Sequence, residues 1–527
     1  MKNEQPATFS VTDAPAWLRD AVFYEIYPQT FYDTNGDGIG DFAGITEKLP
    51  YIRSLGCNAL WINPCFDSPF KDAGYDVRDY KRVAPRYGTN EDLYHLFEEA
   101  HRQGIRVILD LVPGHTSEEH PWFLKSGEET PNEYSGRYIW SDDWIKGIPG
   151  APYIGGERPR NGTYMLNFFK CQPALNYGWL HPTEPWQCAT DSPEALATRE
   201  AMKDVMRFWL DRGADGFRVD MAGSLVKGDD DQKSGTCAIW RDIRTMLDRE
   251  YPEAALVAEW SWPEQAIVSG GFHADFYLDH WDNGYHTLLR DGQNSFFRRD
   301  GQGDIHRFLK DYLPRYATSR DHGYIAMITC NHDTPRVCPD LTPEEAKLAY
   351  AFLLTLPGVP FIYYGDEIGM RYQAGMPTKE GGYTRTGTRT PMQWAAGKNL
   401  GFSDADASLL YLPVDASPDA PTVEAQEGDP ASLLETVRAL VRFRHEHKDL
   451  AADTDFEAFE IPGEPHALVY RRGGLYLCVN PSGKAVPLPE AIAKKLSGRQ
   501  CLFALGANKA GDASDILPPE SFAIYGA

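Results

Sequence analysis

The chain has 527 residues, of which 42% are hydrophobic and 24% are charged, a composition typical of a globular protein. A wholly disordered chain is excluded, and so is a collagen-like or coiled-coil one, because Gly and Pro are scattered without a period. The 76 acidic residues outnumber the 52 basic ones. This balance argues against binding to nucleic acid or to an anionic membrane surface, whose phosphates attract Lys and Arg.

Neither a secretory signal nor a membrane span is expected. The first residues, MKNEQPATFS, are polar, and no apolar stretch reaches the about 18 residues that a transmembrane helix needs. The nine cysteines are dispersed and show no metal-binding spacing. We therefore expect reduced, mostly buried thiols in a cytoplasmic protein.

Eight short apolar runs alternate with polar loops and helical segments. Because the runs are mostly continuous rather than alternating, they indicate parallel strands that are covered on both faces. Helical patterns over Asn90–Gln103 and Thr198–Arg212 end near Gly104 and Gly213, as a helix C-terminus does. This order predicts an α/β fold, a (β/α)8 TIM barrel. The eight runs are Ala21–Tyr27, Asn58–Ile62, Ile105–Val112, Asp215–Asp220, Ala255–Trp260, Asp275–Asp279, Ile325–Cys330 and Val359–Gly365.

Two connections are too long for plain barrel loops. The segment from Pro113 to Pro193 is rich in Gly, Pro, Trp and Tyr and predicts a subdomain inserted after strand three. A second long loop follows strand eight, and helix Pro430–His447 then closes the barrel. Short alternating segments after it predict a C-terminal antiparallel β domain. The expected limits are residues 1–112 and 194–447 for the barrel, 113–193 for the inserted subdomain and 448–527 for the C-terminal domain.

Carboxylates recur where predicted strands end. Asp110 lies in strand three, Asp220 ends strand four, Glu259 ends strand five and Asp333 follows strand seven. Catalytic groups of such barrels lie at the carboxyl ends of the strands. Four acids on one rim repel one another, so we interpret them as a catalytic cluster rather than as four helix caps.

The neighbours of two of these acids favour different roles. Arg218 precedes Asp220 by two residues, so both side chains point to the same face of the strand. A paired arginine keeps a carboxylate ionised, as a nucleophile requires. Glu259 is flanked by Trp260 and Trp262, and apolar neighbours raise the pKa of a carboxyl group, which suits a general acid.

Five motifs together resemble the α-amylase family of retaining glycoside hydrolases. They are DLVPGH (110–115), QPALN (172–176), GFRVD (216–220), AEW (258–260) and NHD (331–333), and the resemblance covers roughly residues 17–445. It implies that Asp220 is the nucleophile, Glu259 the acid/base and Asp333 the stabiliser of the transition state. His115 and His332 match the histidines that bind hydroxyls of the reacting sugar. A retaining enzyme needs such a pair of carboxyls, one to attack the anomeric carbon and one to protonate the leaving oxygen.

Two further motifs narrow the branch. DAGYD (72–76) and RTPMQW (389–394) look like those of exo-acting α-glucosidases, oligo-1,6-glucosidases and trehalose synthases. In that branch an Asp and an Arg clamp the non-reducing end while a Tyr stacks on its ring. We therefore expect Asp72 and Arg389 to meet as a carboxylate–guanidinium pair. The substrate-binding set is then Asp72, Tyr75, His115, Arg218, His332 and Arg389.

The segment DTNGDGIGD (33–41) offers oxygen atoms at alternating positions with glycines at the bends. This spacing is that of a calcium loop without the distant Glu of an EF-hand, and it resembles the metal loop of the same branch. We expect one structural Ca²⁺ or Mg²⁺. The expected ligands are Asp33, Asn35, Asp37, Asp41 and the carbonyl of Ile39.

The chain also departs from the family pattern. Gly114 stands where the family usually has Asn, Ala174 where it has Asp, and Gly223 and Ser224 where amylases have a Lys-His pair. These positions belong to the calcium-binding and starch-binding features of true α-amylases. We therefore expect neither the usual calcium between barrel and insertion nor action on long starch chains. Met221, directly after Asp220, leaves the linkage preference open.

The main expectation is an exo-acting retaining α-glucosidase that releases glucose from the non-reducing end of short α-glucosides. The alternative is an α-transglucosylase or isomerase of the trehalose synthase type, which uses the same glucosyl-enzyme but excludes water. A non-catalytic binding relative is a third reading, disfavoured because all the motif carboxylates are present. The expected partner is a disaccharide or small oligosaccharide, and the oligomeric state is open.

Overall fold

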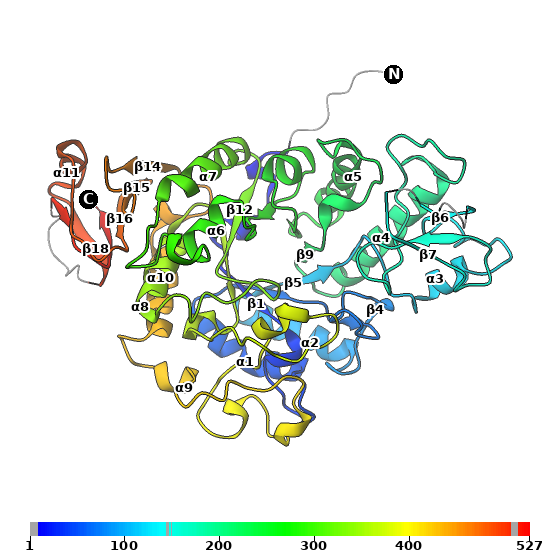
Figure 1. The fold of residues 1–527 in the computed structure, drawn as a ribbon, viewed down its shortest axis with the longest axis horizontal. Coiled ribbons are helices and arrows are strands. Elements are labelled where there is room, and N and C mark those ends of the chain that lie inside the picture. The colour runs from blue at the N-terminus through cyan, green and yellow to red at the C-terminus, as the bar shows by residue number, and fades with distance from the viewer. Residues whose placement is uncertain (1–8, 144–146, 149, 507–514, 527) are drawn as a thin grey trace.

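Eight parallel strands close into a barrel in a computed structural model, which describes residues 9–143, 147–148, 150–506 and 515–526. Around the barrel the strands run in the order β1-β13-β12-β11-β10-β9-β5-β2 (Figure 1). Each predicted apolar run overlaps one of them, so the predicted (β/α)8 barrel is confirmed. Their bounds are β1 (Phe23–Ile26), β2 (Ala59–Ile62), β5 (Arg106–Leu111), β9 (Gly216–Val219), β10 (Ala255–Ala258), β11 (Ala274–Phe276), β12 (Tyr324–Ile328) and β13 (Val359–Tyr363).

The sixth strand differs most from its predicted bounds. It ends at Phe276, because its pairing with β12 stops there, although the apolar run continues. Asp279, predicted as the strand end, lies outside the strand. Its Oδ1 lies 2.7 Å from His286 Nδ1, and its Oδ2 lies 3.3 Å from Arg290 Nη1. The chain thus leaves the sheet early and forms a loop over the rim.

Helices surround the barrel, and local side chains set where they begin. Thr89 and Asp92 form a reciprocal capping box at the start of α2, and Thr342 and Glu345 do so for α8. The fourth helix begins at Pro193, before the predicted start at Thr198, because Ser192 caps it. The principal helices are α1 (Phe42–Ser54), α2 (Asn90–Arg102), α4 (Pro193–Leu210), α5 (Ser234–Glu250), α6 (Gly284–Leu289), α7 (Ile305–Ser319), α8 (Pro343–Thr355) and α10 (Leu433–Glu446).

The connection between β5 and β9 forms a small unit of its own, at the right of Figure 1. It holds α3 (Pro121–Ser126) and a sheet in the order β6-β8-β7. The strands are β6 (Trp140–Ser141), β7 (Tyr153–Gly155) and β8 (Thr163–Met165). The expected limits of this subdomain, 113–193, stay a prediction. A hairpin of β3 (Phe66–Asp67) and β4 (Asp79–Val83) frames the loop that carries Asp72 and Tyr75.

The long connection after β13 consists of loops and short helical segments. One of them, η8 (Tyr383–Thr388), leads into Arg389. Helix α10 then closes the barrel, and an antiparallel sheet follows in the order β14-β15-β16-β20-β18, which confirms the predicted C-terminal domain (Figure 1, left). Its strands are β14 (Phe456–Glu460), β15 (Leu468–Arg472), β16 (Leu475–Asn480), β18 (Gln500–Gly506) and β20 (Ser521–Gly526); β17 (Val486–Pro487) pairs with β19 (Ile516–Leu517), and α11 spans Glu490–Leu496.

The barrel interior is filled by side chains rather than open. Phe23 and Phe361 stack in parallel with ring centroids 4.2 Å apart, and Trp61 packs edge-on against Phe361 at 6.1 Å. Polar groups of the barrel therefore collect at the carboxyl rim, above this apolar filling. No helix within the described ranges is long and apolar enough to cross a membrane.

Candidate active site

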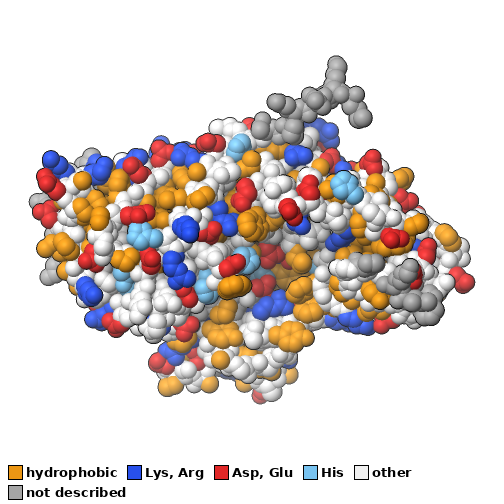
Figure 2. Space-filling view, turned by 45° about the horizontal axis from the view of Figure 1, so that its top comes forward, with side chains coloured by type: hydrophobic (Ala, Val, Ile, Leu, Met, Phe, Trp, Pro, Cys, Tyr) orange, Lys and Arg blue, Asp and Glu red, His pale blue; other side chains and the backbone are white. Residues whose placement is uncertain are grey.

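A cavity of about 710 Å³ opens where β5, β9, β10 and β12 end. Figure 2 shows the hollow on this face of the molecule, with acidic side chains gathered inside it. The three predicted catalytic carboxylates, Asp220, Glu259 and Asp333, all line the cavity, together with Asp72, Tyr75 and His115. The remaining lining residues are Phe168, Met221, Gly223, Ser224, Asp231, Lys233, Trp260, Trp262, Gln265, Leu278, His280 and Arg385.

One buried guanidinium joins the acids of three neighbouring strands. Arg218 Nη1 lies 2.8 Å from Asp110 Oδ1 and 3.3 Å from Asp220 Oδ1. Its Nη2 lies 2.9 Å from Glu259 Oε1. The predicted pairing of Arg218 with Asp220 is therefore present, and the same guanidinium also holds Glu259. Both carboxyl groups of the predicted double displacement thus lie within reach of one side chain that is 1% exposed.

The pKa of Asp220 differs from the sequence expectation. Burial, followed by the charge of Glu259, raises the pKa of Asp220 well above its ordinary value, and Arg218 offsets this only in part. Repulsion from the Glu259 carboxylate thus opposes the ionisation of Asp220. A retaining mechanism needs one protonated and one ionised carboxyl. Glu259 also accepts a hydrogen bond from the backbone N–H of Met221 at 2.9 Å.

Asp333 faces three cationic side chains on the opposite wall. Its Oδ1 lies 2.6 Å from Arg389 Nη2 and 3.1 Å from Arg385 Nη1, and its Oδ2 lies 3.3 Å from His332 Nε2. Burial alone would raise the pKa of Asp333, but His332 and then the two arginines hold it well below the usual range. Asp333 is therefore ionised, as a group that stabilises positive charge must be.

The predicted pairing of Asp72 with Arg389 is wrong, because another arginine takes that position. Asp72 pairs with Arg385, whose Nη2 lies 3.5 Å from Asp72 Oδ1, and not with Arg389. Arg389 is 2% exposed and lies behind Asp333, where its Nε donates to the carbonyl of His332 at 2.8 Å. Gln172 donates to Asp72 Oδ2 at 2.7 Å, and burial raises the pKa of Asp72 to about 6. Arg385 thus bridges the two carboxylates of this corner.

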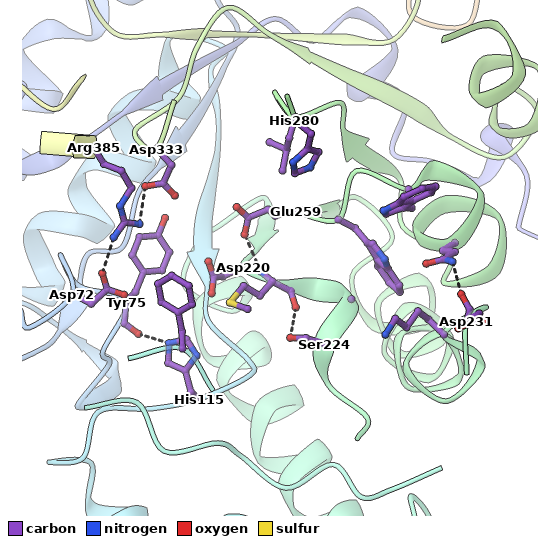
Figure 3. A pocket seen from close by; sticks show the side chains of 18 residues that line it. Asp72, Tyr75, His115, Asp220, Ser224, Asp231, Glu259, His280, Asp333 and Arg385 are labelled. Carbon is purple, nitrogen blue, oxygen red and sulfur yellow. Dashed lines mark hydrogen bonds and ion pairs between the residues drawn. The ribbon is translucent and has the colours of Figure 1, made fainter. Parts of the chain in front are cut away.

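Arg385 was missed by the motif comparison because it stands outside RTPMQW. It lies in the short 3₁₀ segment η8, and Arg389 follows at the C-terminal cap of that segment, so the same turn brings both arginines to Asp333. Figure 3 shows Arg385 between Asp72 and Asp333, with Tyr75 below it.

The two predicted histidines are buried and differ in charge. His115 accepts from Asn167 Nδ2 at 3.0 Å and donates to the carbonyl of Tyr75 at 3.2 Å, and burial lowers its pKa to about 3. His115 is therefore neutral. His332 lies between Glu25 and Tyr75, with Nδ1 2.8 Å from Glu25 Oε1 and Nε2 2.6 Å from the Tyr75 hydroxyl.

A half-buried lysine lies at the junction of barrel and insertion. Lys227 Nζ donates to the carbonyl of Ser224 at 2.8 Å and to Asn167 Oδ1 at 3.4 Å. Asn167 is the residue that bonds His115, and it also lies 3.0 Å from where a Cβ on Gly114 would stand. Burial lowers the pKa of Lys227 to about 8, so the ammonium form still prevails at neutral pH. This positive charge disfavours the binding of a metal cation at the junction. The sequence departs from the family pattern at the same place.

The predicted metal loop has the right donors in the right order. Asp33, Asn35 and Asp37 each accept a hydrogen bond from the backbone N–H two residues further on, at 2.9–3.1 Å, so that alternate side chains curl into the loop. Asp41 instead caps α1 through the N–H of Gly44. Over the described part of the chain, no three His, Cys, Asp or Glu side chains are grouped closely enough to hold a metal. A cation here would need the amide oxygen of Asn35 and the carbonyl of Ile39 as well.

The cavity has a second end that sequence reasoning did not predict. In Figure 3, Asp72, Tyr75, Asp333 and Arg385 lie on one side of Asp220 and Glu259, and Asp231 lies on the other. Gln265 Nε2 donates to the carbonyl of Asp231 at 2.9 Å, and Lys233, Trp262 and His280 also line the cavity. These residues follow β9, β10 and β11, so the strand-end rule points to their loops but not to the individual side chains. A few polar groups among apolar ones are typical of a small-molecule site.

Comparison with known proteins places the fold and the site in one family. Residues 25–453 match the α-amylase catalytic domain. The trehalose synthase/amylase of Mycolicibacterium smegmatis is 34% identical over 484 residues, which cover 83% of this chain and 78% of that protein. The oligo-1,6-glucosidase of Heyndrickxia coagulans is 31% identical, over 86% of this chain and 90% of its own.

A solved structure agrees with these sequence matches. An isomaltulose synthase variant from Erwinia rhapontici NX5, in complex with its natural substrate sucrose, superposes with a TM-score of 0.79 at 26% identity and covers 97% of this chain and 99% of its own. These matches agree with the barrel, its carboxylate rim and the motifs. The chain therefore belongs to the α-amylase family and is an enzyme that acts on glycosidic bonds.

Proposed function

We propose that the protein is a retaining α-glucosyl-transferring isomerase that converts one glucosyl disaccharide into another, as trehalose synthases do. The similarity to a trehalose synthase/amylase over 83% of the chain supports this reading over the α-glucosidase that the motifs led us to expect first. The observation that carries it is the cavity itself: the candidate nucleophile and acid/base lie in its middle, with one group of polar side chains on either side. Such a cavity can hold a glucosyl unit and its partner sugar at the same time.

In the first step, Asp220 attacks the anomeric carbon and Glu259 gives its proton to the glycosidic oxygen, so that the bond to the second sugar breaks. A covalent glucosyl ester on Asp220 results. In the second step, Glu259 removes the proton of the incoming hydroxyl, which attacks the same carbon and releases Asp220. Two inversions return the α configuration. Arg218 bonds both carboxyls and stabilises whichever of them is ionised.

The glucosyl unit is held on the side of Asp72 and Arg385. Asp333 is ionised, so it can accept hydrogen bonds from sugar hydroxyls and stabilise the positive charge that develops on the ring. His115, being neutral, offers a hydrogen-bonding edge without adding charge. Tyr75 is 5% exposed and forms the wall beneath the ring.

The partner sugar belongs on the opposite side, among Asp231, Lys233, Gln265 and His280. An isomerase has to keep this sugar bound while the glucosyl-enzyme exists, and has to keep water away from it. The same carboxylates also serve hydrolysis, so the second candidate is the exo-acting α-glucosidase, favoured by the similarity to an oligo-1,6-glucosidase. Arg385 bonded to Asp72 closes the far end of the glucosyl side and supports exo action for either candidate.

A product analysis separates the two. The unmutated protein is incubated with maltose, trehalose, isomaltose or sucrose in the presence of ¹³C-labelled glucose, and the products are identified by chromatography and mass spectrometry. We expect a new, unlabelled disaccharide as the main product from at least one substrate. Free glucose as the main product from every substrate would establish the α-glucosidase instead, and labelled disaccharide would indicate transfer to an external acceptor. An Asp220→Asn variant controls for contaminating activity.

A further inference from the structure

A glutamate of the first barrel strand lies under the glucosyl side of the cavity. Glu25 in β1 is fully buried, and its Oε1 lies 2.8 Å from His332 Nδ1. The same oxygen accepts from Asn63 Nδ2 at 3.1 Å, whereas Oε2 is buried without a hydrogen-bond partner. Burying a carboxylate costs free energy, so a glutamate here calls for a function that an uncharged residue could not supply.

The other edge of the imidazole faces the cavity. His332 Nε2 lies 2.6 Å from the Tyr75 hydroxyl oxygen and 3.3 Å from Asp333 Oδ2. The Tyr75 hydroxyl donates its own proton to Asp110 Oδ2 at 3.2 Å, so its oxygen is free to accept from His332. With Glu25 on one edge and Asp333 on the other, both ring nitrogens of His332 can donate at once, which is the arrangement of an imidazolium between two carboxylates.

We propose that Glu25 is a positioning residue that holds His332 as a cation, and that this cation in turn fixes Asp333 ionised and in place for the glucosyl unit. The proposal rests on the proposed function, since it takes Asp333 and His332 as the groups that bind the sugar. It adds a residue from β1, which only β13 separates from β12 in the barrel, and this residue is not among those that line the cavity.

The charges around His332 support this arrangement. Burial would lower the pKa of His332, but Asp333 and then Glu25 raise it to about 9. The other charged groups of this corner are Asp110 from β5, Arg218 from β9, and Arg385 and Arg389 from the loop after β13; Tyr27 stacks on the ring with centroids 6.5 Å apart. Over the described part of the chain, Glu25 and Asp333 are the charged groups that pair with the imidazole.

The sign of the pH dependence follows from this. The pKa of His332 in the folded protein lies above the ordinary value of about 6.5. His332 is therefore fully protonated below about pH 6.5 and loses its charge as the pH rises through about 9. Removing the charge of Glu25 lowers the pKa of His332, so that the cation is lost at a lower pH.

Glu25→Gln tests this with little change in shape. The amide oxygen can accept from His332, and the amide nitrogen takes the place of Oε2, which has no partner. Glu367→Gln is the matched control: Glu367 is also fully buried, its Oε1 accepts from Tyr24 and Tyr51 at 2.7 Å, and its Oε2 is equally without a partner.

We measure kcat/KM on the disaccharide substrate between about pH 5 and pH 10. The alkaline limb should move to lower pH by about one unit or more in Glu25→Gln alone. An unchanged limb, or the same shift in Glu367→Gln, overturns the proposal.

A second measurement needs neither activity nor a variant of Glu25. Nitrogen-15 NMR of the histidine-labelled protein reports the protonation of each of the 14 histidines, and His332→Asn identifies the signal by its loss. We expect the His332 signal to stay that of an imidazolium up to at least about pH 8. A His332 that loses its proton near pH 6.5 contradicts the proposal and leaves the proposed function intact. A persistent imidazolium in a protein that converts no disaccharide supports Glu25 while the proposed function fails.

Discussion

Arg385 connects the two carboxylates that define the glucosyl side of the cavity. It lies 3.1 Å from Asp333 and 3.5 Å from Asp72, and it also donates to the carbonyl of Gly381 at 2.9 Å. Arg389, the arginine of the motif, is buried behind it and orients Asp333 from the back. Arg385 lines the cavity and Arg389 does not, so we propose that a terminal sugar contacts Arg385 directly and that Arg389 acts through Asp333.

Replacing the Arg385 side chain should reduce the stabilisation of the transition state without unfolding the protein. Arg385→Ala removes hydrogen bonds between charged partners, each contributing about 1.5–3 kcal/mol, so we expect kcat/KM to fall about 10- to 100-fold. The control is Arg371→Ala, which removes an ion pair with Asp419 at 2.8 Å on the same long connection. Steady-state kinetics on the disaccharide substrate decide. Equal kinetics for Arg385→Ala and the unmutated protein would remove Arg385 from the site.

If Asp220 is the nucleophile, as we propose, its raised pKa predicts the acidic limit of activity. Because burial raises the pKa of Asp220 well above the ordinary value near 4, the fraction of enzyme with an ionised nucleophile falls as the pH drops through that raised pKa. The acidic limb of kcat/KM should therefore lie clearly above pH 4. A profile that stays flat down to about pH 4 would mean that the pair does not control the reaction.

At the scale of elements, the loop between η3 (Pro28–Thr30) and α1 can be tested for a cation apart from catalysis. We propose Ca²⁺ or Mg²⁺ on Asp33, Asn35, Asp37, Asp41 and the Ile39 carbonyl, since the donors curl inward in sequence. An ion that binds only the folded state raises the melting temperature. Chelation should then lower it by roughly 3 °C or more, measured by calorimetry.

A conservative variant separates the ion from the hydrogen bonds of the loop. Asp37→Asn keeps an oxygen for the N–H of Ile39 but removes a charge from the ligand set. It should lower the melting temperature in the presence of calcium and have little effect after chelation. The metal is rejected if chelation changes nothing and elemental analysis finds no ion.

The strands and the candidate site were predictable to different degrees, for physical reasons. Continuous apolar runs such as Val359–Gly365 locate strands well, because both faces of a parallel barrel strand are buried. The carboxylates could be predicted because they directly follow such strands. Arg385 and Lys233 could not, because each stands in a long connection whose path is set by packing against distant segments. Helix starts were missed by several residues where a cap, as at Ser192, lies outside the apolar pattern.

At the scale of the whole molecule, the proposed function assigns the two sugars to loops on two sides of the cavity. The loops after β2, β12 and β13 supply Asp72, Asp333 and Arg385 to the glucosyl side. The loops after β9, β10 and β11 supply the opposite side. The motifs shared across the branch describe the first side, so we propose that the second side decides between isomerisation and hydrolysis. Substitutions at Lys233 or His280 should therefore change the ratio of products more than the rate of glucosyl-enzyme formation.

The proposed mechanism requires a covalent glucosyl ester on Asp220, and trapping that ester tests it most directly. Glu259→Gln is incubated with α-glucosyl fluoride, whose fluoride leaves without a proton from Glu259, so that the ester forms but breaks down slowly. Digestion and mass spectrometry should find one hexose on the peptide that contains Asp220, and none when Asp220→Asn is added to the variant. No adduct, an adduct on another carboxylate, or β-glucose as the first product of the unmutated enzyme would contradict the mechanism.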